Sequence, residues 1–102
     1  MELMFQGCES LKYISMNNFV TSQVYSMESL FKGCKSLTSI DLSKFDTSQV
    51  INFKNMFDSC SSLTSLNLNK FDVEWSRYFE YMFNGCESLE TLEISEFETT
   101  YA

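Results

Sequence analysis

Two hydrophobic periods alternate along this chain, and the alternation recurs every 26 residues. Between Leu37 and Phe45 the apolar residues follow an L-x-x-I-x-L-x-x-F spacing, whose centre has the period of two that is typical of a strand. Between Val50 and Cys60 they follow at i, i+3, i+6, i+7 and i+10, the spacing of a helix with one buried face. This stretch therefore predicts a short strand near 39–43 and a helix near 49–58.

The predicted helices have start and stop signals of their own. Asp46, Thr47 and Ser48 precede the second helix and carry side-chain oxygens that can accept hydrogen bonds from free N–H groups at a helix start. Glycine stands where the helix must end in three of the four recurrences, with serine in the remaining one, at Gly7, Gly33, Gly85 and Ser59. We expect each repeat to contain a strand, a turn, a capped helix and a second turn.

The recurrence keeps its register through the whole chain, with one cysteine per repeat at Cys8, Cys34, Cys60 and Cys86. A strand and a helix of this size cannot bury their apolar faces alone, so stacking of successive repeats must create the core. We predict a single domain over residues 1–102. Its expected fold is an α/β leucine-rich-repeat solenoid of about four 26-residue coils, with a parallel β-sheet on one face and helices on the other. Because the chain starts and stops inside a repeat, we also expect a fragment of a longer repeat array.

The repeat MFxxCxSLTSxxLSxFDTSxV resembles the BspA-like leucine-rich repeats of bacterial and protist surface proteins, over essentially the whole chain. The residues that fall on the family pattern include Phe57, Cys60, Leu63, Leu66, Leu68, Phe71 and Asp72. The sequence departs from the pattern at Val73 to Arg77, where VEWSR replaces TSQVI. The resemblance implies a cell-surface or secreted protein and a non-catalytic protein-interaction or adhesion module. The alternative function is a structural scaffold subunit that stacks within a larger assembly.

Composition narrows the range of partners. The net charge is −7, from 7 Lys and Arg against 14 Asp and Glu. Phosphate backbones and anionic membranes would be repelled, so we expect no nucleic-acid partner. No apolar run reaches the roughly 18 residues that span a bilayer, and the first residues lack a signal-peptide layout, so we expect no direct membrane insertion. The expected partners are proteins, with end-to-end or lateral assembly with other chains as a further possibility.

The sequence contains no arrangement typical of catalysis or metal binding. It has no histidine, which is the commonest general base, and its cysteines stand one per repeat instead of in the close pairs of zinc sites. We therefore expect no enzymatic activity, no cofactor and no metal. We expect the cysteines to form a ladder of free, buried thiols, although a disulfide between stacked repeats is the alternative.

Two surfaces are candidates for partner binding. The first is the outward face of the predicted sheet, which the period of two assigns to alternate strand residues. Its candidate binding residues are Tyr13, Asn17, Asp41, Asn67, Asn69 and Glu93. A plain solvated sheet face explains these residues equally well.

The second candidate surface is an aromatic stripe on the third predicted helix. Three positions that are polar in the earlier repeats become aromatic together, at Trp75, Tyr78 and Tyr81, and Tyr101 repeats the Trp75 position. Their spacing would place them on one helix side, and Trp and Tyr are favoured interface anchors. Alternatively, Trp75 folds into the core to replace a valine, because Ser76 stands at the position of Val50.

Overall fold

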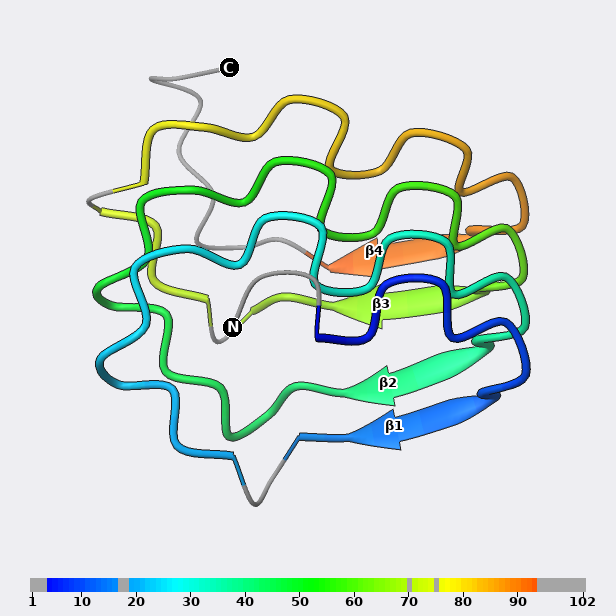
Figure 1. Cartoon of the computed structure of the whole chain (residues 1–102), viewed down its shortest axis with the longest axis horizontal. Coiled ribbons are helices and arrows are strands. Elements are labelled where there is room, and N and C mark those ends of the chain that lie inside the picture. Colours follow the sequence, from blue (N-terminus) through cyan, green and yellow to red (C-terminus); the bar gives the residue numbers. More distant parts are fainter. Residues whose placement is uncertain (1–3, 17–18, 70, 75, 94–102) are drawn as a thin grey trace.

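Each repeat places one short strand at the same point of its sequence. The structure is a computed structural model that describes residues 4–16, 19–69, 71–74 and 76–93. The strands within these residues are β1 (Tyr13–Ser15), β2 (Ser39–Asp41), β3 (Ser65–Asn67) and β4 (Thr91–Glu93). The chain makes one circuit between one strand and the next, so that the repeats stack on one another (Figure 1). We call these circuits layers 1 to 4, and their described residues lie within 4–26, 27–52, 53–78 and 79–93.

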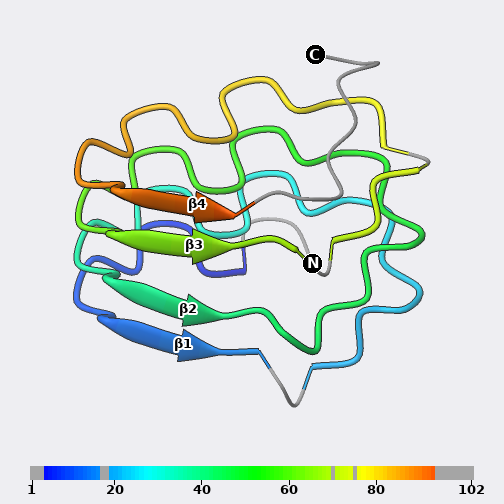
Figure 2. The ribbon, with the colours of Figure 1, turned by 180° about the vertical axis from the view of Figure 1, so that it is seen from behind.

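The strands pair in parallel, as predicted, but they form two sheets instead of one. β1 pairs with β2, with Ile14 opposite Ile40, and β3 pairs with β4, with Leu66 opposite Leu92. β2 and β3 are neighbours without a ladder between their described residues. Just before these strands, the Thr64 N–H donates to the Thr38 carbonyl over 3.3 Å. Figure 2 shows the two pairs along the same side of the molecule.

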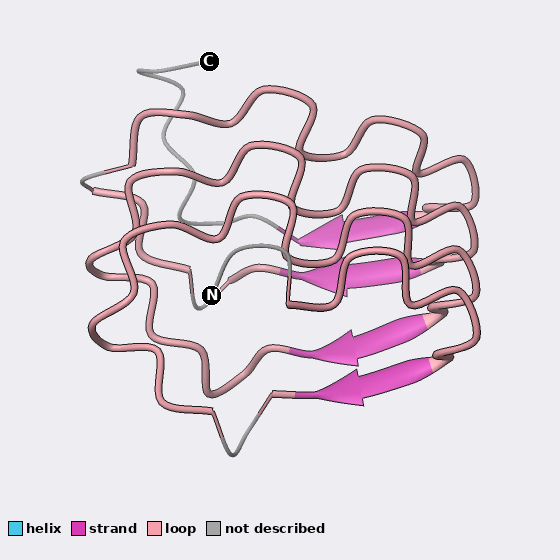
Figure 3. Cartoon of the chain, in the orientation of Figure 1, coloured by secondary structure: helices cyan, strands magenta, loops and turns pink. Residues whose placement is uncertain are grey.

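The predicted helices are absent from the part of the chain that the structure describes (Figure 3). Tight turns take their place. In one turn the Leu30 N–H donates to the Met27 carbonyl over 3.2 Å, and Ser29 has a φ of 58°. In the next, the Cys34 N–H donates to the Phe31 carbonyl over 3.1 Å, and Gly33 has a φ of 76°. A positive φ at the third residue is the geometry of a type II turn. The glycines predicted as helix ends are turn residues instead.

Hydrogen bonds between layers replace those of a helix. From layer 2 to layer 3, the Ser29 N–H donates to the Lys54 carbonyl over 2.9 Å. From layer 3 to layer 4, the Asn55 N–H donates to the Glu80 carbonyl over 3.0 Å. The molecule measures 32 × 27 × 19 Å, so four layers make a short, compact body. The predicted α/β leucine-rich-repeat solenoid with helices on one face is therefore wrong.

The residues of the predicted helical stripe do lie in the core. Val50, Phe53, Met56, Phe57 and Cys60 are all fully buried. Phe57 stacks on an equivalent phenylalanine on either side, with ring centroids 5.5 Å away in layer 2 and 6.0 Å away in layer 4. Phe5, Phe31, Phe57 and Phe83 thus form a column of stacked rings that joins the layers.

The predicted helix cap at Asp46–Ser48 is also wrong, and its residues join layers instead. The buried Thr47 hydroxyl donates to the Asp72 carbonyl over 3.0 Å and accepts from the Asp72 N–H over 2.8 Å. The Asp46 carboxylate accepts hydrogen bonds from the Ser48 hydroxyl and N–H, which lowers the pKa of Asp46. Such side-chain bonds to the following backbone are typical of turns.

Candidate binding surface

The boundary between the two strand pairs forms a groove of about 410 Å³. It is lined from β2 and the residues after it, and from β3 and the residues after it. We call it the β2–β3 groove, and its lining residues are Ile40, Asp41, Leu42, Ser43, Asn67 and Asn69. β2 and β3, which line the groove, do not form a ladder along their length. An apolar floor with convergent polar groups is the usual form of a ligand site.

Hydrogen bonds fix the polar side chains of this groove. One Asp41 carboxylate oxygen accepts from the Ser43 N–H over 3.0 Å and from the Ser43 hydroxyl over 2.7 Å. The Asn67 side-chain oxygen accepts from the Asn69 N–H over 2.9 Å. The Asn69 side-chain amide donates to the Glu93 carboxylate over 3.0 Å. These bonds hold the groups in place without burying them, since Asn67 and Glu93 are exposed.

The structure thus brings together four of the six sheet-face residues predicted as binding residues. Asp41, Asn67 and Asn69 line the β2–β3 groove, and Glu93 is hydrogen-bonded to Asn69. Tyr13 lies on β1 with 53% of its surface exposed, next to Ser39 of β2. Asn17 lies outside the described residues. Whether these residues bind a partner stays a prediction.

The aromatic stripe loses its helical basis, although the two described tyrosines are exposed. Tyr78 is 46% exposed, and the Lys54 ammonium lies 5.3 Å from its ring centroid. Tyr81 is 67% exposed and has a φ of 58°. Trp75 and Tyr101 lie outside the described residues. The alternative that Trp75 repairs the core therefore stays open, but Ser76 is buried and donates to the Val50 carbonyl over 2.6 Å.

The conformation of Tyr81 leads to a stability prediction. Ser29 and Asn55 occupy the same turn position with φ of 58° and 57°, and a bulky side chain is strained there. We expect Tyr81→Asn to stabilise the protein by about 1 kcal/mol, because asparagine tolerates this backbone geometry. Urea unfolding of both proteins measures the difference. Tyr78→Asn is the control, since Tyr78 also replaces an asparagine but without a positive φ. Equal effects of the two changes would contradict the strain.

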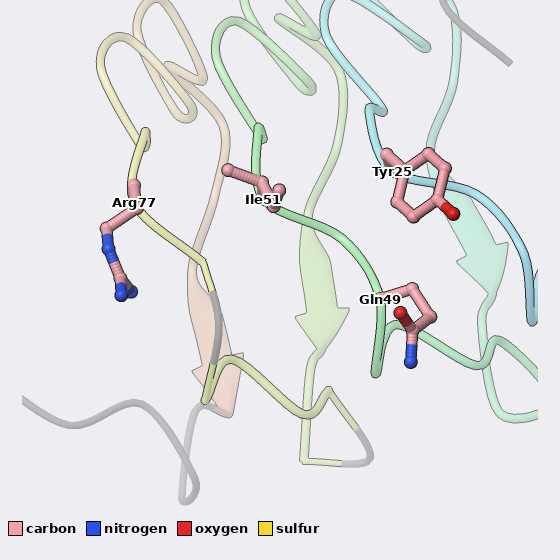
Figure 4. Close-up of a pocket in the computed structure, with 4 residues that line it drawn as sticks. All are labelled: Tyr25, Gln49, Ile51 and Arg77. Atoms are coloured by element: carbon pink, nitrogen blue, oxygen red, sulfur yellow. The ribbon is translucent and has the colours of Figure 1, made fainter.

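Sequence reasoning missed a second exposed patch. It lies on the part of each layer that runs from the end of one strand back to the start of the next, which we call the return half. Tyr25, Gln49, Ile51 and Arg77 line a shallow pocket of about 320 Å³ (Figure 4). Tyr25 is 60% exposed and Ile51 is 41% exposed. The Ile51 N–H donates to the Tyr25 carbonyl and the Arg77 N–H to the Ile51 carbonyl, each over 2.8 Å. One signal could have predicted this patch: large residues stand at the same point of three successive repeats, at Tyr25, Ile51 and Arg77.

The cysteines form the predicted column of free thiols. Cys34 and Cys60 are buried, whereas Cys8 and Cys86 are partly buried. The thiols of Cys34, Cys60 and Cys86 donate to backbone carbonyls of the preceding layer, as from Cys60 to Phe31 over 3.2 Å. Burial raises the pKa of Cys34 to about 11 and that of Cys60 to about 12, with repulsion from neighbouring cysteines adding to each. These groups are unsuited to nucleophilic chemistry, because the thiolate is the reactive form.

The raised pKa values predict slow alkylation. At pH 8 we expect Cys8 to react with iodoacetamide at least about tenfold faster than Cys34 and Cys60 in the folded protein. Mass spectrometry of digested samples over time measures each rate. All four thiols should react after unfolding without reductant. Equal rates in the folded protein would contradict the buried positions.

Within the described residues, the structure has no helix long and apolar enough to cross a membrane.

Comparison with known proteins identifies the family of this chain. No curated protein and no solved structure matches the chain. The family model described as "Mycoplasma protein of unknown function, DUF285" matches residues 1–102. Because that match covers the whole sequence, the chain belongs to the DUF285 family.

Proposed function

We propose that this chain is a non-catalytic protein-binding module whose ligand surface is the β2–β3 groove. The observation that carries the proposal is the gathering of Asp41, Asn67 and Asn69 in one groove with an apolar floor. Hydrogen-bonding groups beside Ile40 and Leu42 suit an extended segment of a protein partner, whose backbone offers donors and acceptors at regular intervals.

The resemblance to BspA-like repeats supports a setting for this function. We propose that the DUF285 repeats of this chain are related to those surface repeats, and that the module acts at a cell surface or after secretion. Adhesion then follows from binding a protein on another surface. The chemistry of the thiols, whose raised pKa values disfavour the thiolate, supports a role in binding over one in catalysis.

A displayed library of random peptides tests the proposed groove. Peptides selected on the immobilised 102-residue chain are measured by interferometry against the wild type and against the double variant Asn67→Ala with Asn69→Ala. Loss of the hydrogen bonds that the Asn67 and Asn69 side chains would make to the peptide should weaken binding about tenfold or more. The matched control is Gln49→Ala with Arg77→Ala, which removes two polar side chains from the pocket on the return half.

The outcomes separate the candidate surfaces. The groove is supported if the Asn67 and Asn69 variant loses affinity while the control variant keeps it. It is contradicted if the control variant alone loses affinity, because the ligand surface would then be the pocket beside Tyr25. Selected peptides that bind all three proteins equally would also contradict it. Thermal unfolding of each variant checks that the fold is retained.

A further inference from the structure

The strands β2 and β3 separate toward their C-terminal ends. Just before the strands begin, the Thr64 N–H still donates to the Thr38 carbonyl over 3.3 Å. Beyond that bond they form no ladder, and Figures 1 and 2 both show their ribbons moving apart toward the arrowheads. The β2–β3 groove lies at this wider end, where residues 40–43 face Asn67 and Asn69. Because the groove lies between layers 2 and 3, any repeats before residue 1 or after residue 102 would leave it in place.

One hydrogen bond that joins the other layers does not form at this end. Between layers 1 and 2 the Met16 N–H donates to the Asp41 carbonyl over 3.1 Å, and between layers 3 and 4 the Leu68 N–H donates to the last residue of β4 over 2.8 Å. The equivalent groups between layers 2 and 3 are the Leu42 N–H and the Asn67 carbonyl. In the described part of the chain these two groups do not bond to each other. An extended segment offers a backbone donor and a backbone acceptor that suit this opening.

The charged residues of the four strands are both acidic. They are Asp41 of β2 and Glu93 of β4, and none of the strands contains a lysine or an arginine. Asp41 lines the groove, and the Asn69 side-chain amide holds the Glu93 carboxylate beside it over 3.0 Å. The groove therefore combines an apolar floor with negative charge, which is complementary to a cation carried on an apolar segment.

We propose that the β2–β3 groove selects an extended protein segment with a lysine or arginine side chain, whose cationic group binds the Asp41 carboxylate. A neighbouring apolar residue of that segment packs on Ile40 and Leu42. This inference rests on the proposed function, because it names the kind of partner that the same groove takes. A hydrogen bond between ionised groups is stronger than one between neutral groups, so the basic side chain supplies much of the selectivity.

The Asp41 carboxylate is already oriented before a partner arrives. The Ser43 N–H and hydroxyl donate to the same oxygen, Oδ1, over 3.0 Å and 2.7 Å. A group that is held in this way loses less side-chain freedom on binding. Asp46 is held in the same manner by the Ser48 N–H and hydroxyl, over 3.0 Å and 2.6 Å, but it does not line the groove. The two aspartates are therefore a matched pair for mutation.

The displayed peptide library supplies the probes for a test. The probes are those selected peptides that bind the wild type and lose affinity for the Asn67→Ala with Asn69→Ala variant. Lysine or arginine should be over-represented at one position of these peptides, compared with the unselected library. In one such peptide the basic residue is then replaced by glutamine. Interferometry measures both forms against the wild type, Asp41→Asn and Asp46→Asn.

The expected result is a preference that depends on Asp41 alone. At low salt the wild type and Asp46→Asn should bind the basic peptide about tenfold more tightly than its glutamine form. Asp41→Asn should bind the two forms about equally. The asparagine oxygen can still accept from Ser43, so the turn is retained and only the charge is lost. The preference of the wild type should shrink as NaCl is raised.

Two results would overturn this inference and leave the proposed function standing. One is a set of groove-dependent peptides in which no basic residue is over-represented. The other is an equal loss on glutamine substitution for the wild type and for Asp41→Asn, because the basic side chain would then bind elsewhere. If no selected peptide depends on Asn67 and Asn69, the proposed function fails and this inference fails with it.

Discussion

Phe57→Ala is expected to lower the free energy of unfolding by about 3–5 kcal/mol, which is a large part of the stability of a small domain. The Phe57 ring is fully buried and stacks between Phe31 at 5.5 Å and Phe83 at 6.0 Å. Its removal leaves a cavity between three layers, and each layer depends mainly on its neighbours for stability. Urea unfolding followed by circular dichroism measures the loss.

Phe19→Ala is the matched control for this change. Phe19 lies in layer 1, is only partly buried, and meets Phe5 edge to face at 6.1 Å. The same truncation there should cost clearly less than in the interior, because part of the ring already contacts water. Similar losses for both variants would show that the layers do not share one continuous core.

Phe57 also illustrates what the sequence could and could not predict. Its burial follows from the apolar spacing, which correctly assigned Val50, Phe53, Met56, Phe57 and Cys60 to the core. The helix was wrong because consecutive turns also bring every third or fourth residue to one side. Apolar spacing alone does not separate these two backbones. What separates them is the positive φ at Asn55 and Ser59, which no helix accommodates.

The hydrogen-bonding pattern of the predicted helix was also wrong. The predicted helix at 49–58 contains two asparagines, two phenylalanines, a valine, an isoleucine and an aspartate, none of which strongly favours a helix. Its N–H groups find acceptors in the adjacent layer instead, as between Asn55 and Glu80 over 3.0 Å. The repeat period predicted that layers would stack, but it carries no information on which backbone groups face the neighbouring layer.

The sequence predicted residues of the candidate site but not the groove that they line. The period of two assigned Asp41 and Asn67 to the outward face, and both line the β2–β3 groove. The groove itself lies where β2 and β3 form no ladder, which nearly identical repeat sequences do not indicate. The pocket beside Tyr25 and Ile51 was missed because neither residue breaks a polar pattern in its own repeat.

The second large effect is expected at Asp58, a buried carboxylate on the return half of layer 3. It accepts hydrogen bonds from the Asn55 amide over 2.7 Å, the Asn84 amide over 3.2 Å and the Ser59 hydroxyl over 3.1 Å. Burial raises the pKa of Asp58, but these bonds and the charge of Lys32 together outweigh it, so the pKa lies below its usual value.

Asp58→Asn should therefore cost about 2–3 kcal/mol at pH 7, because an amide cannot accept all of these bonds and brings its own donors against those of Asn55 and Asn84. A depressed folded-state pKa stabilises the protein fully above the unfolded-state pKa of about 4, and this contribution is lost as the pH falls through the folded-state value. The stability difference between wild type and variant should thus be constant from pH 7 to about 5 and shrink below about pH 4. Urea unfolding across this range measures the difference.

Asp46→Asn is the control, since Asp46 is exposed and its pKa is also lowered. The same trend should therefore appear with a smaller amplitude. A difference at Asp58 that does not change with pH would show that its carboxylate does not carry the stabilising charge.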